Sequence, residues 1–298
     1  MSSTVTHVGF SDESNWNTGR YGSVALVTMP LEARQPLEGG LGHVLKECGL
    51  GEFSWERFGG VRERGAAEGM CHLAIDKACC RLLRVDALIW DKVDRRHNVR
   101  GRDDIANLER MCYHLFRNVL RLRWPRNAVW RMYVDRHAGV DWDRLARCLE
   151  AASERGEMDR SWQGRGWDSI RVSREYRLEE IVVSSSRECP LVQFADLFAG
   201  MAAFSWNQGD AYQAWLRAAS KQSRGFRHGE KAPALTRRSV ERFRLLQHFV
   251  GCCEQRGVGV SLGGAAGGLW TRYPSNPINF WLYEPQCPQD KAPTRLLA

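Results

Sequence analysis

The sequence predicts an α/β protein in which a β-sheet is covered by helices. Through residues 1–206, short apolar runs alternate with longer segments whose apolar residues recur every three or four positions. The chain has 298 residues, of which 43% are hydrophobic and 26% are charged. It is therefore long enough and apolar enough to bury a sizeable core.

The first elements are expected to be two strands and a helix. Residues 5–10 and 21–29 are apolar runs, and the polar segment between them contains Asn and Gly. Such a connection allows an antiparallel hairpin. A helix is expected over residues 36–48, with Gly49 ending it.

Two longer helices follow, with a short strand between them at residues 86–90. The helix at residues 62–83 carries one apolar face: Ala66, Met70, Leu73, Ala74, Ala78 and Leu82. Within residues 102–123, apolar residues form a single stripe: Ile105, Leu108, Cys112, Leu115, Val119 and Leu122. Three arginines fall outside this stripe and indicate a solvated face: Arg110, Arg117 and Arg121.

The next strand covers residues 128–134 and ends at Asp135. A helix over residues 141–153 is expected to begin with Asp141 as its N-cap. Residues 154–168 are polar and contain glycine, which indicates a loop. Two strands and one helix should follow, at residues 168–173, 180–185 and 190–206.

The composition changes after Trp206, so residues 1–206 are expected to form the core and residues 207–298 an extension packed on it. This extension contains a basic stretch at residues 221–228 and a predicted helix at residues 235–255. Residues 257–298 are rich in Gly, Pro and Trp, and we expect little regular structure there.

The bulk properties favour a cytoplasmic protein. No apolar run approaches the ~20 residues that a membrane span requires, and the N-terminus lacks the pattern of a secretory signal. The ten cysteines include two vicinal pairs, Cys79-Cys80 and Cys252-Cys253, but no CxxC pair. Reduced thiols are therefore a better interpretation than disulfides or a zinc ribbon.

The formal net charge is +8, and most basic residues are arginine. The planar guanidinium fork matches phosphate oxygens, so this bias is compatible with a nucleic-acid partner. Arginine-rich composition also follows from GC-rich coding, so charge by itself leaves both interpretations open.

Four widely spaced carboxylates stand where a metal-dependent nuclease needs acids: Asp12, Glu52, Asp135 and Asp196. Asp12 and Asp135 follow strand-like runs, and Asp196 lies inside an apolar helix. An ionised aspartate in such surroundings is costly unless a positive charge neutralises it. Converging carboxylates suit hard cations such as Mg²⁺ or Mn²⁺.

Each acid also has an ordinary structural explanation. Asp12 could form an Asx-turn, and Asp135 could cap the segment that follows it. Glu52 could be surface charge on a loop, and Asp196 could pair with a buried arginine. Only the order of the acids and the types of element that carry them favour the metal site.

Several sequence blocks resemble the bacterial and phage domain-of-unknown-function family 3800. The two stronger blocks are Asp12-Glu13-Ser14 and Gln193-Phe194-Ala195-Asp196-Leu197-Phe198-Ala199-Gly200. A third block, Glu52-Phe53-Ser54-Trp55, and two interior strands, Trp90-Asp91-Lys92 and Tyr133-Val134-Asp135, are also similar. The resemblance covers about residues 8–206 and extends less securely to residues 276–281.

This resemblance implies a ribonuclease H-like mixed sheet flanked by helices. It also implies that Asp12, Glu52, Asp135 and Asp196 bind two divalent ions ~4 Å apart and hydrolyse phosphodiester bonds. The sequence offers Glu56 in place of Glu52, and Asp91 or Asp94 in place of Asp135. Three further residues are possible auxiliary groups: Glu13, Lys92 and His137.

Two other functions remain open at this point. The chain could be a catalytically idle nucleic-acid-binding module, with arginines on phosphates and aromatic rings on bases. It could also be a protein-interaction or defence component. The sequence lacks a GxxxxGK[ST] phosphate loop, an HExxH zinc helix and a Gly-x-Ser-x-Gly elbow. It does not distinguish DNA from RNA, or internal from terminal cleavage, and it leaves the oligomeric state unknown.

Overall fold

The computed structural model describes residues 4–94, 102–137, 139–158, 170–223, 235–263 and 267–285. Its centre is a six-stranded mixed sheet with the strand order β10-β3-β2-β1-β4-β7. The strands of this sheet are β1 (His7–Ser14), β2 (Tyr21–Pro30), β3 (Arg84–Asp91), β4 (Val129–Asp135), β7 (Arg177–Ser184) and β10 (Ile278–Leu282). The helices are α1 (Arg34–Glu47), α2 (Val61–Cys79), α3 (Asp104–Leu122), α4 (Trp142–Ser153), α5 (Val192–Asn207), α6 (Gly209–Ser223) and α7 (Arg237–Gln255), with a 3-10 turn at Leu31–Ala33.

The first three strands form an antiparallel meander, and the later strands add to both of its edges. β1 pairs antiparallel with β2, and β2 pairs antiparallel with β3. β4 and β7 then extend the sheet in parallel beyond β1, while β10 pairs parallel with β3 at the other edge. β3 and β4 run in the same direction on either side of β2 and β1, and α3 lies in the crossover that connects them.

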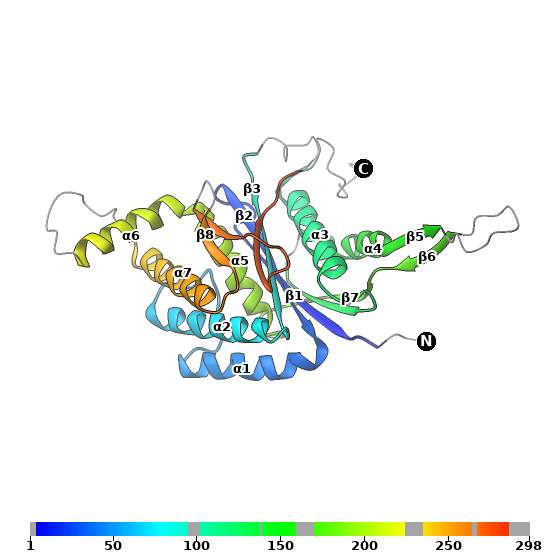
Figure 1. Cartoon of the computed structure of the whole chain (residues 1–298), viewed down its shortest axis with the longest axis horizontal. Helices are drawn as coiled ribbons and strands as arrows, with labels where there is room; N and C mark the ends of the chain where they lie inside the picture. Colours follow the sequence, from blue (N-terminus) through cyan, green and yellow to red (C-terminus); the bar gives the residue numbers. More distant parts are fainter. Residues whose placement is uncertain are drawn as a thin grey trace, which may run out of the picture.

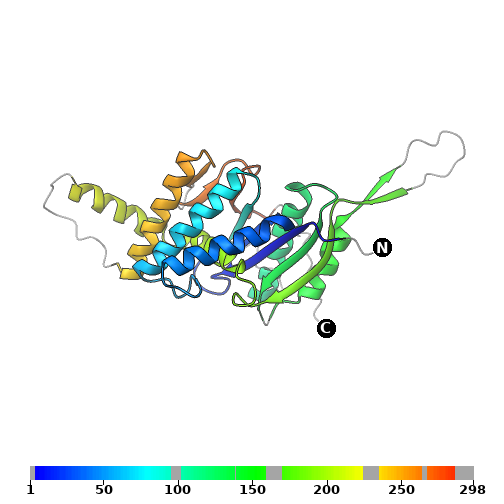
Figure 2. The ribbon, with the colours of Figure 1, turned by 90° about the horizontal axis from the view of Figure 1, so that it is seen from below.

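Helices cover both faces of the sheet. One face packs against α1, α2, α5 and α7, and the other packs against α3 and α4 (Figures 1 and 2). Alternate residues of a strand point to opposite faces. Val8 and Phe10 of β1 therefore belong to the first core, while Met132 and Val134 of β4 belong to the second. Only strand residues that face the first core can therefore contact α5.

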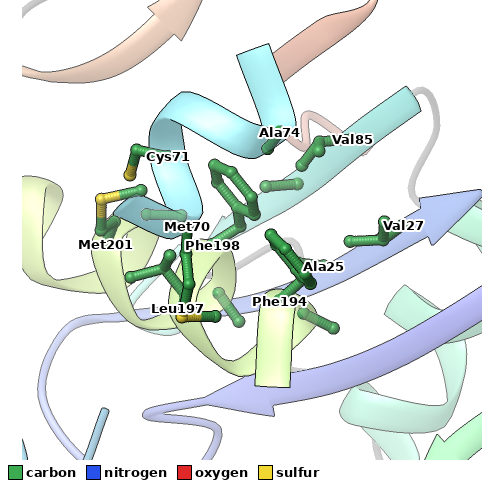
Figure 3. Close-up of a cluster of buried hydrophobic side chains, with 14 of the residues drawn as sticks. Ala25, Val27, Met70, Cys71, Ala74, Val85, Phe194, Leu197, Phe198 and Met201 are labelled. Carbon is green, nitrogen blue, oxygen red and sulfur yellow. The ribbon is translucent and has the colours of Figure 1, made fainter. Parts of the chain in front are cut away.

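The core beneath α5 is continuous with the sheet and with α2. Figure 3 shows Phe194, Leu197 and Phe198 of α5 beside Ala25 of β2 and Ala74 of α2, all of them fully buried. Ser23 of β2 also donates a hydrogen bond at 2.6 Å to the backbone carbonyl of Ala199. α5 is thus fixed in position on β1 and β2, and the candidate site depends on that placement.

The predicted α/β class, with a mixed sheet flanked by helices, is confirmed. The hairpin between β1 and β2 is confirmed as well, and so is the N-cap of α4, where Asp141 accepts from the backbone N–H of Arg144. The predicted first strand was too short, because β1 continues to Ser14 and so includes Asp12. Within the described residues, no helix is both long and apolar enough to cross a bilayer.

Two details of the helix predictions were wrong. The second helix ends at Cys79, and Arg81 adopts a left-handed backbone conformation, so Leu82 is exposed instead of continuing the apolar face. Arg110 is buried, not solvated. Its guanidinium lies 5.4 Å from the Tyr283 ring centroid and donates to the Tyr283 hydroxyl, which compensates for removing the charge from water.

The region after α4 is more regular than its composition predicts. Residues expected to form a loop include a strand, β5 (Glu154–Met158), which pairs antiparallel with β6 (Ile170–Arg174) in a projecting hairpin (Figure 1). Residues 159–169, which include the start of the predicted strand at 168–173, lie outside the described residues. Most of the basic stretch at residues 221–228 also lies outside them, and residues 221–223 end α6.

The C-terminal region also contains elements that the sequence did not predict. α6 was missed, and residues 257–285 contain β8 (Val260–Gly263), β9 (Gly268–Thr271) and β10. β10 is an edge strand of the central sheet. The boundary at residue 206 stays a prediction, but residues 278–282 of the predicted extension complete the sheet of the predicted core.

Candidate active site

Two of the predicted acids lie next to each other on neighbouring strands. β1 and β4 are parallel, with Phe10 opposite Tyr133 and Ser11 opposite Val134. The next pair in that register is Asp12 and Asp135. The Phe10 and Tyr133 rings stack at 5.3 Å on the α5 side of the sheet, so the acids two residues further on face the same side.

Asp196 reaches the same place from α5. One face of this helix contacts the segment at residues 53–55, which follows α1. Three helix residues about one turn apart make these contacts: Gln193, Asp196 and Gly200. Gln193 accepts the backbone N–H of Phe53, and Asp196 accepts the backbone N–H of Trp55, both at 2.7 Å. One turn later, a Cβ on Gly200 would lie 2.1 Å from the Trp55 ring.

This arrangement explains why two of the sequence blocks contain the residues they do. Gln193 and Asp196 bind alternate backbone N–H groups of an extended segment, and Gly200 leaves the space that the Trp55 ring fills. That ring is also covered by Arg242 of α7, whose guanidinium lies 4.4 Å from the ring centroid. Asp196 is therefore held in a fixed orientation.

The three aspartates line one cleft of about 560 Å³. The β1–β2 connection, the segment after α1, the end of β4 and the start of α7 form its walls. The lining residues are Asp12, Glu13, Ser14, Asn15, Trp16, Asn17, Thr18, Glu52, Phe53, Ser54, Trp55, Glu56, Arg57, Asp135, Ser186, Asp196, Arg238 and Arg242.

Four of the carboxylates in this cleft hold their protons more tightly than usual. Burial, and then the nearby charges of Asp196, Glu13 and Asp135, raise the pKa of Asp12 well above its ordinary value. Burial raises the pKa of Asp196 and of Glu13 to about 7 in each case. Burial also raises the pKa of Asp135. Several like charges are thus concentrated in a poorly solvated space.

No ion pair neutralises Asp12, Asp135 or Asp196 within the part of the chain that the structure describes. Asp196 has the backbone N–H of Trp55, and Asp12 has that of Glu13 at 2.8 Å, which leaves further oxygen lone pairs directed into the cleft. Buried carboxylates that lack a basic partner are suited to a divalent cation, and oxygen donors are the ligands that Mg²⁺ and Mn²⁺ prefer.

Glu52 lies in the cleft but is already paired. It accepts hydrogen bonds from the Ser186 hydroxyl and, at 2.8 Å, from Arg57. These two bonds lower the pKa of Glu52, opposite to the shift of the aspartates. Its rival Glu56 is exposed and also lines the cleft.

The rivals of Asp135 lie elsewhere. Asp91, at the end of β3, accepts a two-pronged ion pair from Arg20 and is absent from the cleft lining, as is Asp94. The geometry therefore favours Asp135 as the strand-end acid. No such choice arises for Asp12 and Asp196.

The predicted auxiliary residues have different positions. Glu13 lines the cleft, and its carboxylate lies 3.8 Å from Nε2 of His137. The His137 ring in turn packs edge-on against Trp16 at 4.8 Å. Lys92 is outside the cleft lining. Its ammonium donates to the backbone carbonyls of Asn15 and Thr18, so it supports the β1–β2 connection and is not free to contact a phosphate.

Sequence reasoning missed the basic side of the cleft. Arg57, Arg238 and Arg242 line it, and two of them come from α7, far from the acids in sequence. Burial lowers the pKa of Arg242 to about 10, so this guanidinium stays charged at neutral pH. Nothing in the pattern of α7 distinguishes these arginines from Arg237 or Arg244.

The raised pKa of Asp196 predicts how metal-free stability depends on pH. The folded state keeps a proton up to about pH 7, whereas an unfolded aspartate loses it near pH 4. Stability should therefore fall as pH rises through that window. We expect Asp196→Asn, which keeps an acceptor for Trp55, to stabilise the metal-free protein at pH 8 by about 1–3 kcal/mol and to have little effect at pH 4.

Thermal melts in a chelator at pH 4, 6 and 8 measure this effect, and Glu52→Gln provides a control of opposite sign. The pKa of Glu52 is lowered, so its charge stabilises the fold above the unfolded pKa of about 4.3, and that contribution is lost at low pH. Glu52→Gln should therefore lower the melting temperature at pH 8. Destabilisation of Asp196→Asn at pH 8 would indicate that Asp196 is the partner of a buried cation.

Comparison with known proteins assigns the chain to a family. It is 36% identical over 305 residues to the uncharacterized protein ORF2 of Methanothermobacter thermautotrophicus, covering 99% of this chain and 100% of the relative. The chain belongs to the ORF2 family. A second member from the same organism, the uncharacterized protein ORF2′, is 34% identical over 302 residues, again covering 99% of this chain and 100% of the relative.

Comparison with solved structures gives matches to two ribonucleases, both with low scores. A chain of the PCNA:RNase HII complex from Archaeoglobus fulgidus matches with a TM-score of 0.39 and 17% identity, covering 77% of this ORF2-family chain and 82% of the other. Ribonuclease H2 from Pyrococcus horikoshii OT3 matches with a TM-score of 0.37 and 17% identity, covering 82% and 98%. Both scores are low, and neither likeness indicates a function for this chain.

No family model matches the chain. Its resemblance to the domain-of-unknown-function family 3800 therefore stays a prediction.

Proposed function

We propose that this ORF2-family protein is a metal-dependent nuclease that hydrolyses phosphodiester bonds. The observation that carries the proposal is the convergence of Asp12, Asp135 and Asp196, from three elements, on one cleft in which none of the described basic side chains forms an ion pair with them. A cluster of buried acids with raised pKa values is costly to the fold, and such clusters concentrate at functional sites.

The residues divide into ligands and supports. Asp12 and Asp135 approach from the sheet and Asp196 from the helix above it, so their oxygens are available from two sides of one space. Trp55 orients Asp196 through its backbone N–H, and Gly200 lets Trp55 approach. Glu13 and Glu52 are both candidates for a fourth acid: the pKa of Glu13 is raised like those of the aspartates, whereas Ser186 and Arg57 already donate hydrogen bonds to Glu52.

Mg²⁺ or Mn²⁺ bound by these acids would neutralise them and stabilise the negative charge that develops on a phosphate during hydrolysis. The need for a positive charge is clearest at Asp12. Its burial and the charges of three neighbouring acids together raise its pKa and disfavour its ionised form. The cluster therefore fits a divalent cation, because it offers only oxygen donors and its negative charge would be compensated by the ion.

The basic residues of the cleft support a nucleic-acid substrate. Arg57 and Arg238 are exposed at its edge, where a guanidinium can bind phosphates on either side of the reacting one. The net charge of +8 adds a general attraction for a polyanion.

The experiment that tests the proposal is cleavage of labelled substrates by the purified full-length chain. Single-stranded DNA, duplex DNA, single-stranded RNA and an RNA·DNA hybrid are incubated with Mg²⁺, Mn²⁺ or a chelator. We expect cleavage of at least one substrate class with either cation and none with the chelator. Binding without cleavage of any substrate would instead support a catalytically idle binding module.

A further inference from the structure

We propose that His72, His248 and Cys252 form a second metal site, of the zinc class, that joins α2 to α7. Their ligand atoms all lie within 4.8 Å of one another, and they are the one such group of three among the residues that the structure describes. The acids of the cleft are spread more widely. This site is a separate cluster, and the inference does not depend on nuclease activity.

The distances between the ligand atoms are close to those that one tetrahedral ion requires. Nε2 of His72 lies 2.9 Å from Nε2 of His248, and Sγ of Cys252 lies 3.5 Å from His248 and 3.9 Å from His72. With Zn–N near 2.05 Å and Zn–S near 2.3 Å, tetrahedral geometry needs about 3.4 Å between two nitrogens and about 3.6 Å between nitrogen and sulfur. Shifts of about half an ångström satisfy all three.

The helices present these ligands by regular spacing. His248 and Cys252 are four residues apart on α7, so they lie one turn apart on the same face. His72 comes from α2, which packs along α7. The His72 and His248 rings meet nearly perpendicularly with their centroids 4.9 Å apart, which directs both Nε2 atoms to one point.

The donor set identifies the class of metal. Two imidazole nitrogens and a thiolate suit Zn²⁺ and related transition metals, whereas Mg²⁺ takes oxygen ligands. The cluster is partly exposed, so an ion can enter from solvent, and the fourth position is open to water. Glu68 lies one turn before His72 and forms an ion pair with Arg64 at 2.7 Å. The proposed ligands are therefore the two imidazoles and the thiol, without a carboxylate.

A metal here would cross-link the helix that carries the arginines of the cleft. Arg242, which covers Trp55, lies six residues before His248 on α7. α2 and α7 both pack in the core beneath α5. The cross-link would therefore hold α7, and with it Arg242, against the body of the protein.

The test uses the full-length chain carrying Asp12→Asn, so that ions binding in the acidic cleft contribute less. Co²⁺ is added as the spectroscopic probe, because a tetrahedral cobalt–thiolate site absorbs distinctively, and Zn²⁺ is then used to displace it. Two ligand variants sit on different helices, Cys252→Ser and His72→Asn. Cys79→Ser, which changes an exposed cysteine of α2, is the matched control.

We expect one Co²⁺ per chain with thiolate absorption, displaced by one equivalent of Zn²⁺, and unchanged in Cys79→Ser. Cys252→Ser should lose the thiolate band, and both ligand variants should weaken Zn²⁺ binding by at least about tenfold. Zn²⁺ should also raise the melting temperature of the parent more than that of either variant. Absence of thiolate absorption, or equal affinity in His72→Asn and the parent, would overturn the proposal.

Discussion

Replacing Asp12 with asparagine is expected to reduce metal-dependent cleavage by about 10³-fold or more, while nucleic-acid binding changes little. Losing one carboxylate removes a ligand oxygen and a charge from the centre of the cluster, and several kcal/mol of transition-state stabilisation depend on the ions held there. Affinity for the polyanion comes mainly from cation–phosphate contacts, which this change leaves intact. Single-turnover cleavage and salt-dependent binding measurements separate the two effects.

Asp91→Asn is the matched control for this experiment. Asp91 is also a strand-end aspartate of the same sheet, but it pairs with Arg20 and lies outside the cleft lining. Its loss removes an ion pair whose arginine is largely exposed, and such exposed pairs contribute little to stability. Cleavage by this variant should remain close to that of the parent. If Asp12→Asn cleaves as well as Asp91→Asn does, the catalytic role of the aspartates is wrong.

The strand-borne acids were predictable because strands are periodic. Phe10 and Asp12 share one face of β1, and Tyr133 and Asp135 share one face of β4, by the alternation that the sequence itself displays. The order of the strands in the sheet could not be predicted from this alternation. That β4 pairs with β1, and that the register brings Asp12 next to Asp135, depends on contacts more than a hundred residues apart.

The helix-borne acid was predictable for a different reason. An aspartate inside an apolar helix has few explanations. Among the described residues Asp196 forms no ion pair, although the nearby charges of Arg242 and Arg57 favour its ionised form. Lys92 was misjudged because its position after a strand does not reveal that its ammonium would bind two backbone carbonyls of a neighbouring loop. The arginines of α7 were missed because a helix that supplies one wall of a cleft has no distinguishing pattern.

The C-terminal strands illustrate the limit of local patterns. Residues 278–282 are too few to show a period, and the surrounding glycines and prolines indicate turns. β10 forms because β3 offers an unpaired edge, with Phe280 opposite Ala87. Asn279 donates a hydrogen bond to the buried Asp86, which also accepts one from Arg84. This edge therefore depends on polar contacts, which the apolar pattern of the sequence does not predict.

Replacing Gly200 with alanine is expected to destabilise the protein by about 1–3 kcal/mol, although alanine is the better helix former. The added Cβ would overlap the Trp55 ring, since the nearest ring atom lies 2.1 Å from its position. The ring has little room to retreat, because Arg242 covers it and Phe58 packs against it at 5.5 Å. Displacing Trp55 also withdraws the N–H that orients Asp196.

Gly251→Ala is the control, because Gly251 also lies inside a helix but has no atom within 4 Å of an added Cβ. Alanine there should stabilise the protein by about 0.5–1 kcal/mol. Denaturant unfolding compares the two variants, and a Mg²⁺ titration of cleavage tests whether Gly200→Ala requires more metal. A Gly200→Ala protein as stable as Gly251→Ala would mean that Trp55 does not need α5 to hold it. In that case the orientation of Asp196 must depend on something other than this packing.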